Sequence, residues 1–83
     1  MTIQGLKLWT PARYRIRVKG TLDPSWSDRL GGMSITTSGE GDEGLVSTLA
    51  GRLLDQAALM GVLDTLYNYY HCPILSVEFL GSA

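Results

Sequence analysis

One amphipathic helix constrains the fold of this chain more than any other feature. Segment 55–70, DQAALMGVLDTLYNYY, carries one stripe of apolar side chains at helical spacing. The stripe consists of Leu59, Val62, Leu63, Leu66 and Tyr70. Asp55 suits the N-cap because its carboxylate can accept a hydrogen bond from the first turn, and Cys72-Pro73 predicts the end of the helix. Such a stripe has to be buried against a second layer of structure.

Four other segments have the pattern of β-strands that would form this second layer. Residues 12–19, ARYRIRVK, alternate strictly between apolar and basic side chains, which predicts one buried and one exposed face. Three further strands are expected at residues 33–37, 45–50 and 73–80. In the last of these, Ile74, Glu78 and Leu80 are expected on the same face as the basic residues of the first strand.

A short helix is predicted between the first two strands, with Asp23 as its cap, Pro24 at its first position and Gly31 at its end. The resulting order is typical of the ferredoxin-like split β-α-β fold, an α+β class whose antiparallel sheet carries both helices on one face. Right-handed crossovers then place the third strand between the first and second, and the fourth beyond the first. A plain meander of the first three strands is the alternative topology.

Composition favours one folded domain. The 83 residues are 45% hydrophobic and 18% charged, which is typical of globular chains. We expect residues 1–11 to form an N-terminal arm and residues 12–83 to form the α+β domain. A single cysteine cannot form an internal disulfide. No basic segment followed by an apolar segment opens the sequence, so we expect a cytoplasmic protein with no membrane partner.

Two parts of the sequence resemble a group of small uncharacterised bacterial proteins. Residues 14–28, YRIRVKGTLDPSWSD, form a strand followed by Gly-x-Leu-x-x-x-Trp-Ser, and residues 55–63 begin a helix with Asp-Gln-Ala-Ala-Leu. Residues 73–78, PILSVE, complete the resemblance, which covers most of the chain after residue 11. It implies a bacterial origin and a self-contained domain, and it brings no activity or catalytic residue. The layout is also similar to ACT-type regulatory domains and dimeric α/β-barrel proteins, at the level of fold only.

No group of residues in the sequence predicts catalysis, a metal site or a cofactor. His71 and Cys72 are each the only residue of their type, whereas a zinc site needs about four ligands. Trp26 and Asp55 are possible pocket residues, although core packing is the preferred interpretation of Trp26 and helix capping that of Asp55. A small enzyme with His71 or a tyrosine as its acid–base residue is a further alternative.

The basic residues of the first strand form a ladder on the sheet face that the helices leave open. Its members are Arg13, Arg15, Arg17 and Lys19. An RNA-recognition sheet of this topology displays aromatic side chains for base stacking, and we expect none on this face. With a net charge of −1 as well, the sequence predicts no nucleic-acid partner. The ladder is expected to pair with Glu78 or with acids of a neighbouring subunit.

Apolar side chains exceed what one small domain can easily bury, which indicates a protein contact. The expected function is a non-enzymatic interaction or regulatory module that self-associates through its sheet face as a homodimer or higher oligomer. The expected interface consists of Trp9, Arg13, Arg15, Arg17, Met60, Tyr67, Ile74, Glu78 and Leu80. The alternative function is a small-ligand sensor of ACT-like type that binds at a subunit interface.

Overall fold

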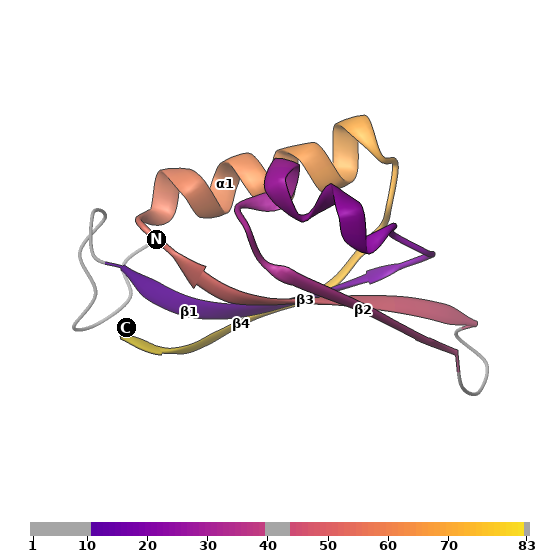
Figure 1. The fold of residues 1–83 in the computed structure, drawn as a ribbon, viewed down its shortest axis with the longest axis horizontal. Helices are drawn as coiled ribbons and strands as arrows, with labels where there is room; N and C mark the ends of the chain where they lie inside the picture. The colour runs from indigo at the N-terminus through magenta and orange to yellow at the C-terminus, as the bar shows by residue number, and fades with distance from the viewer. Residues whose placement is uncertain (1–10, 40–43, 83) are drawn as a thin grey trace.

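A four-stranded antiparallel sheet and a layer of helices on one of its faces make up the fold (Figure 1). The structure, a computed structural model, describes residues 11–39 and 44–82. In chain order, its elements are strand β1 (Ala12–Lys19), the 3-10 helix η1 (Pro24–Leu30), strand β2 (Ser34–Gly39), strand β3 (Leu45–Leu53), helix α1 (Gln56–Asp64), the π-helical segment η3 (Thr65–Tyr69) and strand β4 (Ile74–Ser82). The α+β class expected from the sequence is confirmed.

The strands lie in the order β2-β3-β1-β4, and every neighbouring pair is antiparallel. It follows that β1 and β2 run parallel with β3 between them, and that β3 and β4 run parallel with β1 between them. Helix η1 lies on the connection from β1 to β2, and α1 with η3 lies on the connection from β3 to β4. A plain meander would have paired β1 with β2, so that alternative is wrong.

Strand β1 provides the centre of the core. Its apolar side chains Ala12, Tyr14, Ile16 and Val18 are at most 2% exposed, and every residue between them is exposed. The helix covers this face with Leu59, Val62 and Leu66, all buried as the helical stripe predicts. Burial of each such side chain stabilises the fold by roughly 1.5–3 kcal/mol.

Both predicted helix caps are present. Asp55 Oδ1 accepts a hydrogen bond from Ala58 N at 2.7 Å, and Asp23 Oδ1 accepts one from Ser25 N at 2.9 Å. The long helix is not regular to its end, because it widens into a π-helical turn over Thr65–Tyr69. A 3.6-residue periodicity does not predict this turn, which is rare in proteins and often found at functional sites.

The face assignment of Ile74 in the last strand was wrong. The register of β4 against β1 shifts between Arg17 and Val18, and this places Ile74 opposite Val18. Its side chain therefore packs against the core instead of lying on the outer face with Glu78. The bulge adds one residue at Leu75, and a strict two-residue alternation cannot anticipate such an insertion.

A buried hydroxyl ties the connection after β1 to the sheet. Ser47 of β3 is 0% exposed and donates a hydrogen bond to Gly20 O at 2.7 Å. It accepts a hydrogen bond from Leu22 N at 3.0 Å and shares another with Thr37 Oγ1 at 3.0 Å. One side chain therefore satisfies backbone groups that are removed from water as the chain leaves β1.

We predict that Ser47→Ala lowers the free energy of unfolding by about 1–3 kcal/mol, because it leaves the Leu22 N–H without its acceptor. Urea denaturation measures this change. Thr48→Ala is the matched control, since Thr48 is the next residue and faces the opposite side of the sheet. Equal losses for the two variants would show that the buried network does not stabilise the fold.

Candidate interaction surfaces

Strand β4 forms one edge of the sheet. Within residues 11–39 and 44–82 it pairs only with β1, so its other side carries no strand. Four apolar side chains along it are between 42% and 48% exposed: Leu75, Val77, Phe79 and Leu80. The opposite edge, β2, is shorter and consists mainly of exposed serine, threonine and glycine. The two edges of the sheet therefore differ in length and in polarity.

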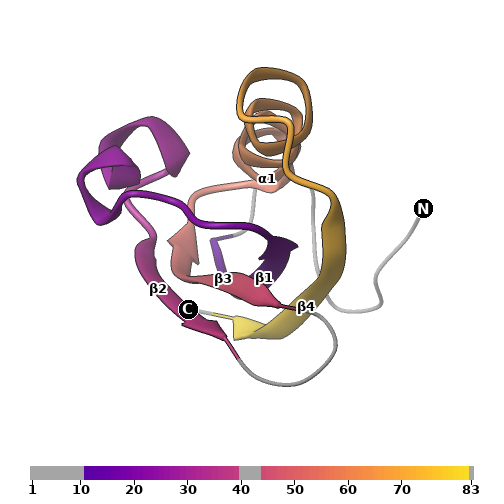
Figure 2. The same ribbon diagram turned by 90° about the vertical axis from the view of Figure 1, so that its right-hand side faces the viewer.

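The inner side of β4 is uncovered because the helix layer is narrow. Val77 and Phe79 lie opposite Ile16 and Tyr14 in the register, so they point toward the helix layer. Their 42% exposure contrasts with at most 2% for their β1 neighbours. Helix η1 packs against β2, and α1 packs against β3 (Figure 2). The Phe79 ring meets the Tyr14 ring edge-to-face, with the ring centroids 5.9 Å apart.

Helix α1 extends this apolar side. Thr65 lines a groove together with Arg29 of η1, which shows that the Thr65 side of the helix faces η1. Met60 and Tyr67 project from the other flank, at about 140° or more around the helix axis from Thr65. They are 55% and 61% exposed. The apolar residues of this flank and those of β4 are therefore on the same open side of the domain.

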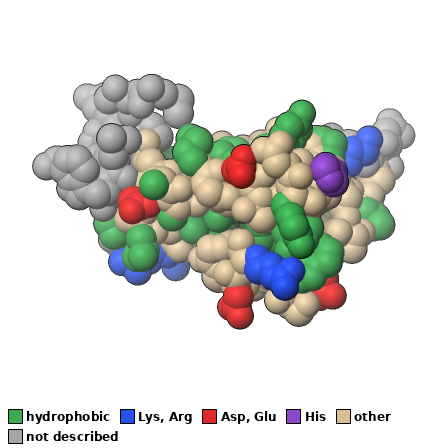
Figure 3. Space-filling view, turned by 90° about the horizontal axis from the view of Figure 1, so that it is seen from above, with side chains coloured by type: hydrophobic (Ala, Val, Ile, Leu, Met, Phe, Trp, Pro, Cys, Tyr) green, Lys and Arg blue, Asp and Glu red, His purple; other side chains and the backbone are tan. Residues whose placement is uncertain are grey.

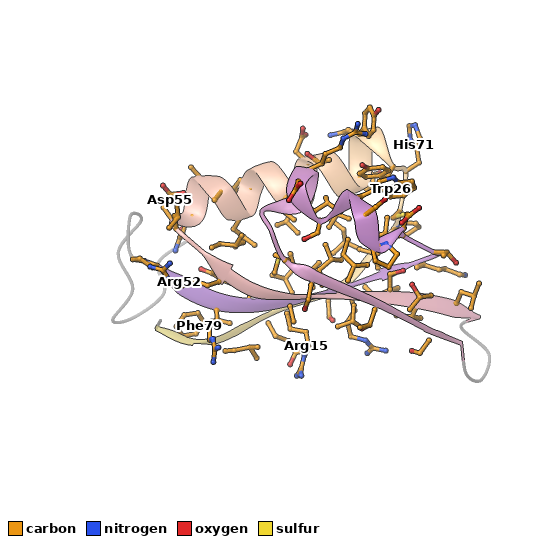
Figure 4. All side chains as sticks on the ribbon, viewed as in Figure 1. Arg15, Trp26, Arg52, Asp55, His71 and Phe79 are labelled. Atoms are coloured by element: carbon orange, nitrogen blue, oxygen red, sulfur yellow. The ribbon has the colours of Figure 1, made fainter. Side chains whose placement is uncertain are left out.

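The outer face of the sheet carries the basic ladder, as expected. Figure 4 shows Arg15 on the side of the sheet away from the helices. Its guanidinium binds Glu78 with two hydrogen bonds, Nε to Oε1 at 3.0 Å and Nη2 to Oε2 at 2.8 Å. The guanidinium lowers the pKa of Glu78 by donating these hydrogen bonds. In the described part of the chain this is the one ion pair, so Arg13, Arg17 and Lys19 have no acidic partner there.

Trp26 and Asp55 do not form a common pocket, because they lie at opposite ends of the helix layer (Figure 4). The Trp26 ring stacks on the Tyr70 ring with centroids 4.5 Å apart. Trp26 also lines a shallow groove along β2 together with Asp23, whereas Asp55 is engaged as a helix cap. The expected Trp26 packing is confirmed in part, since the side chain packs against the core but is only partly buried.

The backbone conformation of His71 and the burial of Cys72 indicate structural roles for both residues. His71 is exposed (Figure 3) and adopts a left-handed backbone conformation, with φ of 57°. Cys72 is buried, and desolvation raises the pKa of its thiol, which favours the unreactive protonated form. Among the described residues, no group of three or more histidine, cysteine or acidic side chains is placed to hold a metal ion.

One expected interface residue is outside the described structure, and one groove was not expected from the sequence. Trp9 is outside the described residues, so its expected place in an interface is not addressed by the structure. The groove next to η3, which Arg29, Asp64 and Asn68 line, was not expected, because it depends on the π-helical turn. In the ranges 11–39 and 44–82, no helix has the length and apolar character needed to cross a membrane.

Comparison with protein families gives one match. A family model described as "Domain of unknown function (DUF8691)" matches residues 13–78. This range begins in β1 and ends in β4, so the match includes the basic ladder and the first part of β4 but ends before Phe79. Neither the search of curated proteins nor the search of solved structures found a protein similar to this chain.

We predict that His71→Gly raises the free energy of unfolding by up to about 1 kcal/mol. Position 71 directly follows the helical segment, and a left-handed residue there is usually glycine, which has no Cβ to strain. Urea denaturation is the measurement, and His71→Ala is the control that keeps the Cβ and is expected to bring no gain. A loss of stability in His71→Gly would show that the imidazole itself makes stabilising contacts.

Proposed function

We propose that this chain, which belongs to the family described as "Domain of unknown function (DUF8691)", is a non-enzymatic interaction module that self-associates. The observation that supports the proposal is the exposed apolar edge strand β4. We also infer that the strand order and the two crossovers represent the ferredoxin-like split β-α-β topology. In this topology β4 is always an edge strand, available for pairing.

Free sheet edges favour unwanted pairing, and proteins normally protect them with short strands, lysines or prolines. Strand β4 is long, and its nine residues include neither lysine nor proline, although a bulge interrupts its pairing with β1 at Leu75. Its one charge, on Glu78, is already paired with Arg15. Polar residues and a length of six residues do protect the other edge, β2. This asymmetry is expected if β4 has a partner and β2 does not.

Self-association through the whole outer sheet face, as first expected from the sequence, is less favourable than pairing through the β4 edge. Two copies stacked face to face would bring the ladders of Arg13, Arg17 and Lys19 together, and like charges across an interface are costly. Pairing through the β4 edge instead leaves these arginines and the lysine outside the contact, where they remain solvated. We therefore place the contact at β4.

An antiparallel pair of β4 strands related by a two-fold axis at Val77 fits the sequence of this edge. In this register Leu75 of one copy lies opposite Phe79 of the other, so that apolar side chains meet. Glu78 of the second copy lies opposite Ser76, which is itself the β1 partner of Arg17. Such a two-fold dimer is closed and self-limiting.

A small-ligand sensor that acts at the subunit interface is the second candidate. One groove favours it: Tyr67, Asn68, His71 and Pro73 line a hollow that adjoins the start of β4. A ligand bound there would contact both the helix end and the paired strand. A native mass spectrum of purified protein separates the two candidates, because only a sensor is expected to retain a small molecule.

We predict that the protein sediments as a dimer of about twice its 9.0 kDa mass at micromolar concentration. Val77→Lys is expected to give a monomer, since it places a lysine at the centre of the pairing edge and two ammonium groups opposite each other in the dimer. Thr36→Lys is the matched control, because it adds the same charge at the middle of the β2 edge. Circular dichroism verifies that both variants are folded.

Two results would contradict this proposal. One is a wild-type protein that remains a monomer over the whole micromolar range. The other is equal dissociation by Thr36→Lys and Val77→Lys, which would place the contact elsewhere.

A further inference from the structure

Charge is separated between the two sides of the domain. In the described part of the chain, every basic residue except Arg29 lies on β1 or near the end of β3. Of the acidic residues within 11–39 and 44–82, all except Glu78 lie in a helix or cap one: Asp23, Asp28, Asp55 and Asp64. Figure 3, seen from the helix side, shows several of these acids spread over that surface. Among the described residues, the sheet face is therefore basic and the helix layer acidic, and the remaining charges of the chain, on Lys7, Glu40, Asp42 and Glu43, lie outside the described ranges.

The basic residues repel one another at close range. Arg13 lies directly across from Arg52 in the β1–β3 register, and like charges directly opposite each other destabilise a sheet. Along β1, alternate residues are about 6.6–6.8 Å apart, so Arg13, Arg15 and Arg17 form a closely spaced row. Glu78 forms its ion pair with Arg15 and interacts only at longer range with Arg17. An external anion would offset the repulsion among the remaining cations.

We propose that the outer face of the sheet binds the phosphate backbone of duplex DNA. Arginine and lysine with neighbouring serine and threonine hydroxyls are the groups that contact phosphate oxygens in such complexes. Beside the ladder, the strands carry such hydroxyls at Ser34, Thr36 and Thr48. A hollow in this face is lined by Arg13, Ser34, Ala50, Gly51 and Leu80. Because Ala50 and Gly51 in this hollow are small, there is room for a phosphate between the Arg13 and Ser34 side chains.

Duplex DNA fits this face better than other polyanions. The outer positions of β1 to β4 in the described ranges hold no aromatic side chain, so single strands would find no stacking surface. An acidic peptide would need pockets for side-chain anchors, and the one hollow here is small and partly polar. Duplex DNA presents a charge every 1.7 Å or so of its length and needs only cations and hydroxyls.

This proposal departs from the expectation that nucleic acid is not a partner. The missing aromatic residues exclude base stacking, but backbone contacts do not require them. The net charge is a property of the whole chain, whereas binding depends on the field of one face. The strand register places Arg52 beside the ladder. This position, which the sequence alone did not reveal, is what makes nucleic acid a plausible partner for this face.

The test is the salt dependence of binding to a fluorescent duplex of random sequence, measured by anisotropy. With four cations that form no ion pair among residues 11–39 and 44–82, namely Arg13, Arg17, Lys19 and Arg52, we expect micromolar affinity at low salt. The logarithm of the association constant should fall with the logarithm of the salt concentration with a slope of about −4. This value follows from roughly −0.9 for each phosphate neutralised by one of the four cations. The double variant Arg13→Gln/Arg17→Gln should bring the slope to about −2, a change of roughly one unit per cation.

Three control measurements accompany this test. Arg29→Gln removes a cation from the helix side and should leave the slope unchanged. Arg13→Lys/Arg17→Lys keeps the charge and should also keep the slope. Val77→Lys, which separates this proposal from self-association, should still bind the duplex in a salt-dependent manner when monomeric, since it does not alter the ladder, but more weakly than the wild-type dimer.

Several outcomes would overturn the proposal. Absence of binding at low salt is one, and an unchanged slope in folded Arg13→Gln/Arg17→Gln is another. Tighter binding to a single strand than to the duplex would indicate a different surface. Tighter binding to phosphatidylserine vesicles or to polyglutamate would assign the face to a membrane or to an acidic protein. Thermal unfolding of each variant verifies that the fold is intact.

Discussion

The connection from β1 to β2 is the constraint on which the rest of the structure depends. It has to pass over β3 within residues 20–33, and a short 3-10 helix achieves this. Gly31 shows how closely this helix packs: a Cβ there would lie 2.7 Å from Leu53 Cδ2 and 3.1 Å from Val62 Cγ2. Its φ of 69° is also a conformation that favours glycine. The buried hydroxyl of Ser47 fixes the start of the same connection.

A narrow helix layer follows from this short connection. Helix η1 covers β2, and the single long helix covers the sheet centre, which leaves the inner side of β4 without a cover. That is why Val77 and Phe79 point to the core side and are still 42% exposed. The arrangement of strands and helices therefore determines where the excess apolar side chains are exposed. They lie on β4, along an edge that can pair with another strand.

Local patterns could be predicted from the sequence, and deviations from regular geometry could not. The alternation of β1 and the caps Asp23 and Asp55 depend on neighbouring residues only, so they were evident before the structure. The face of Ile74 was missed because one bulge reverses the alternation. The groove beside η3 was missed because a π-helical turn has no signature in a 3.6-residue pattern. Trp26 and Asp55 were grouped by chemistry, and only the fold shows their separation.

The β4 edge and the outer face of the sheet can be occupied by different partners at the same time. Pairing through β4 would add strands in the plane of the sheet, so it would leave the outer face open. It would also join two basic ladders side by side on one continuous surface, because both copies keep their helices on the same side of the extended sheet. Non-specific DNA affinity increases with the number of cations that contact phosphates. Dimer formation would therefore strengthen binding at the outer face while using none of the residues that bind there.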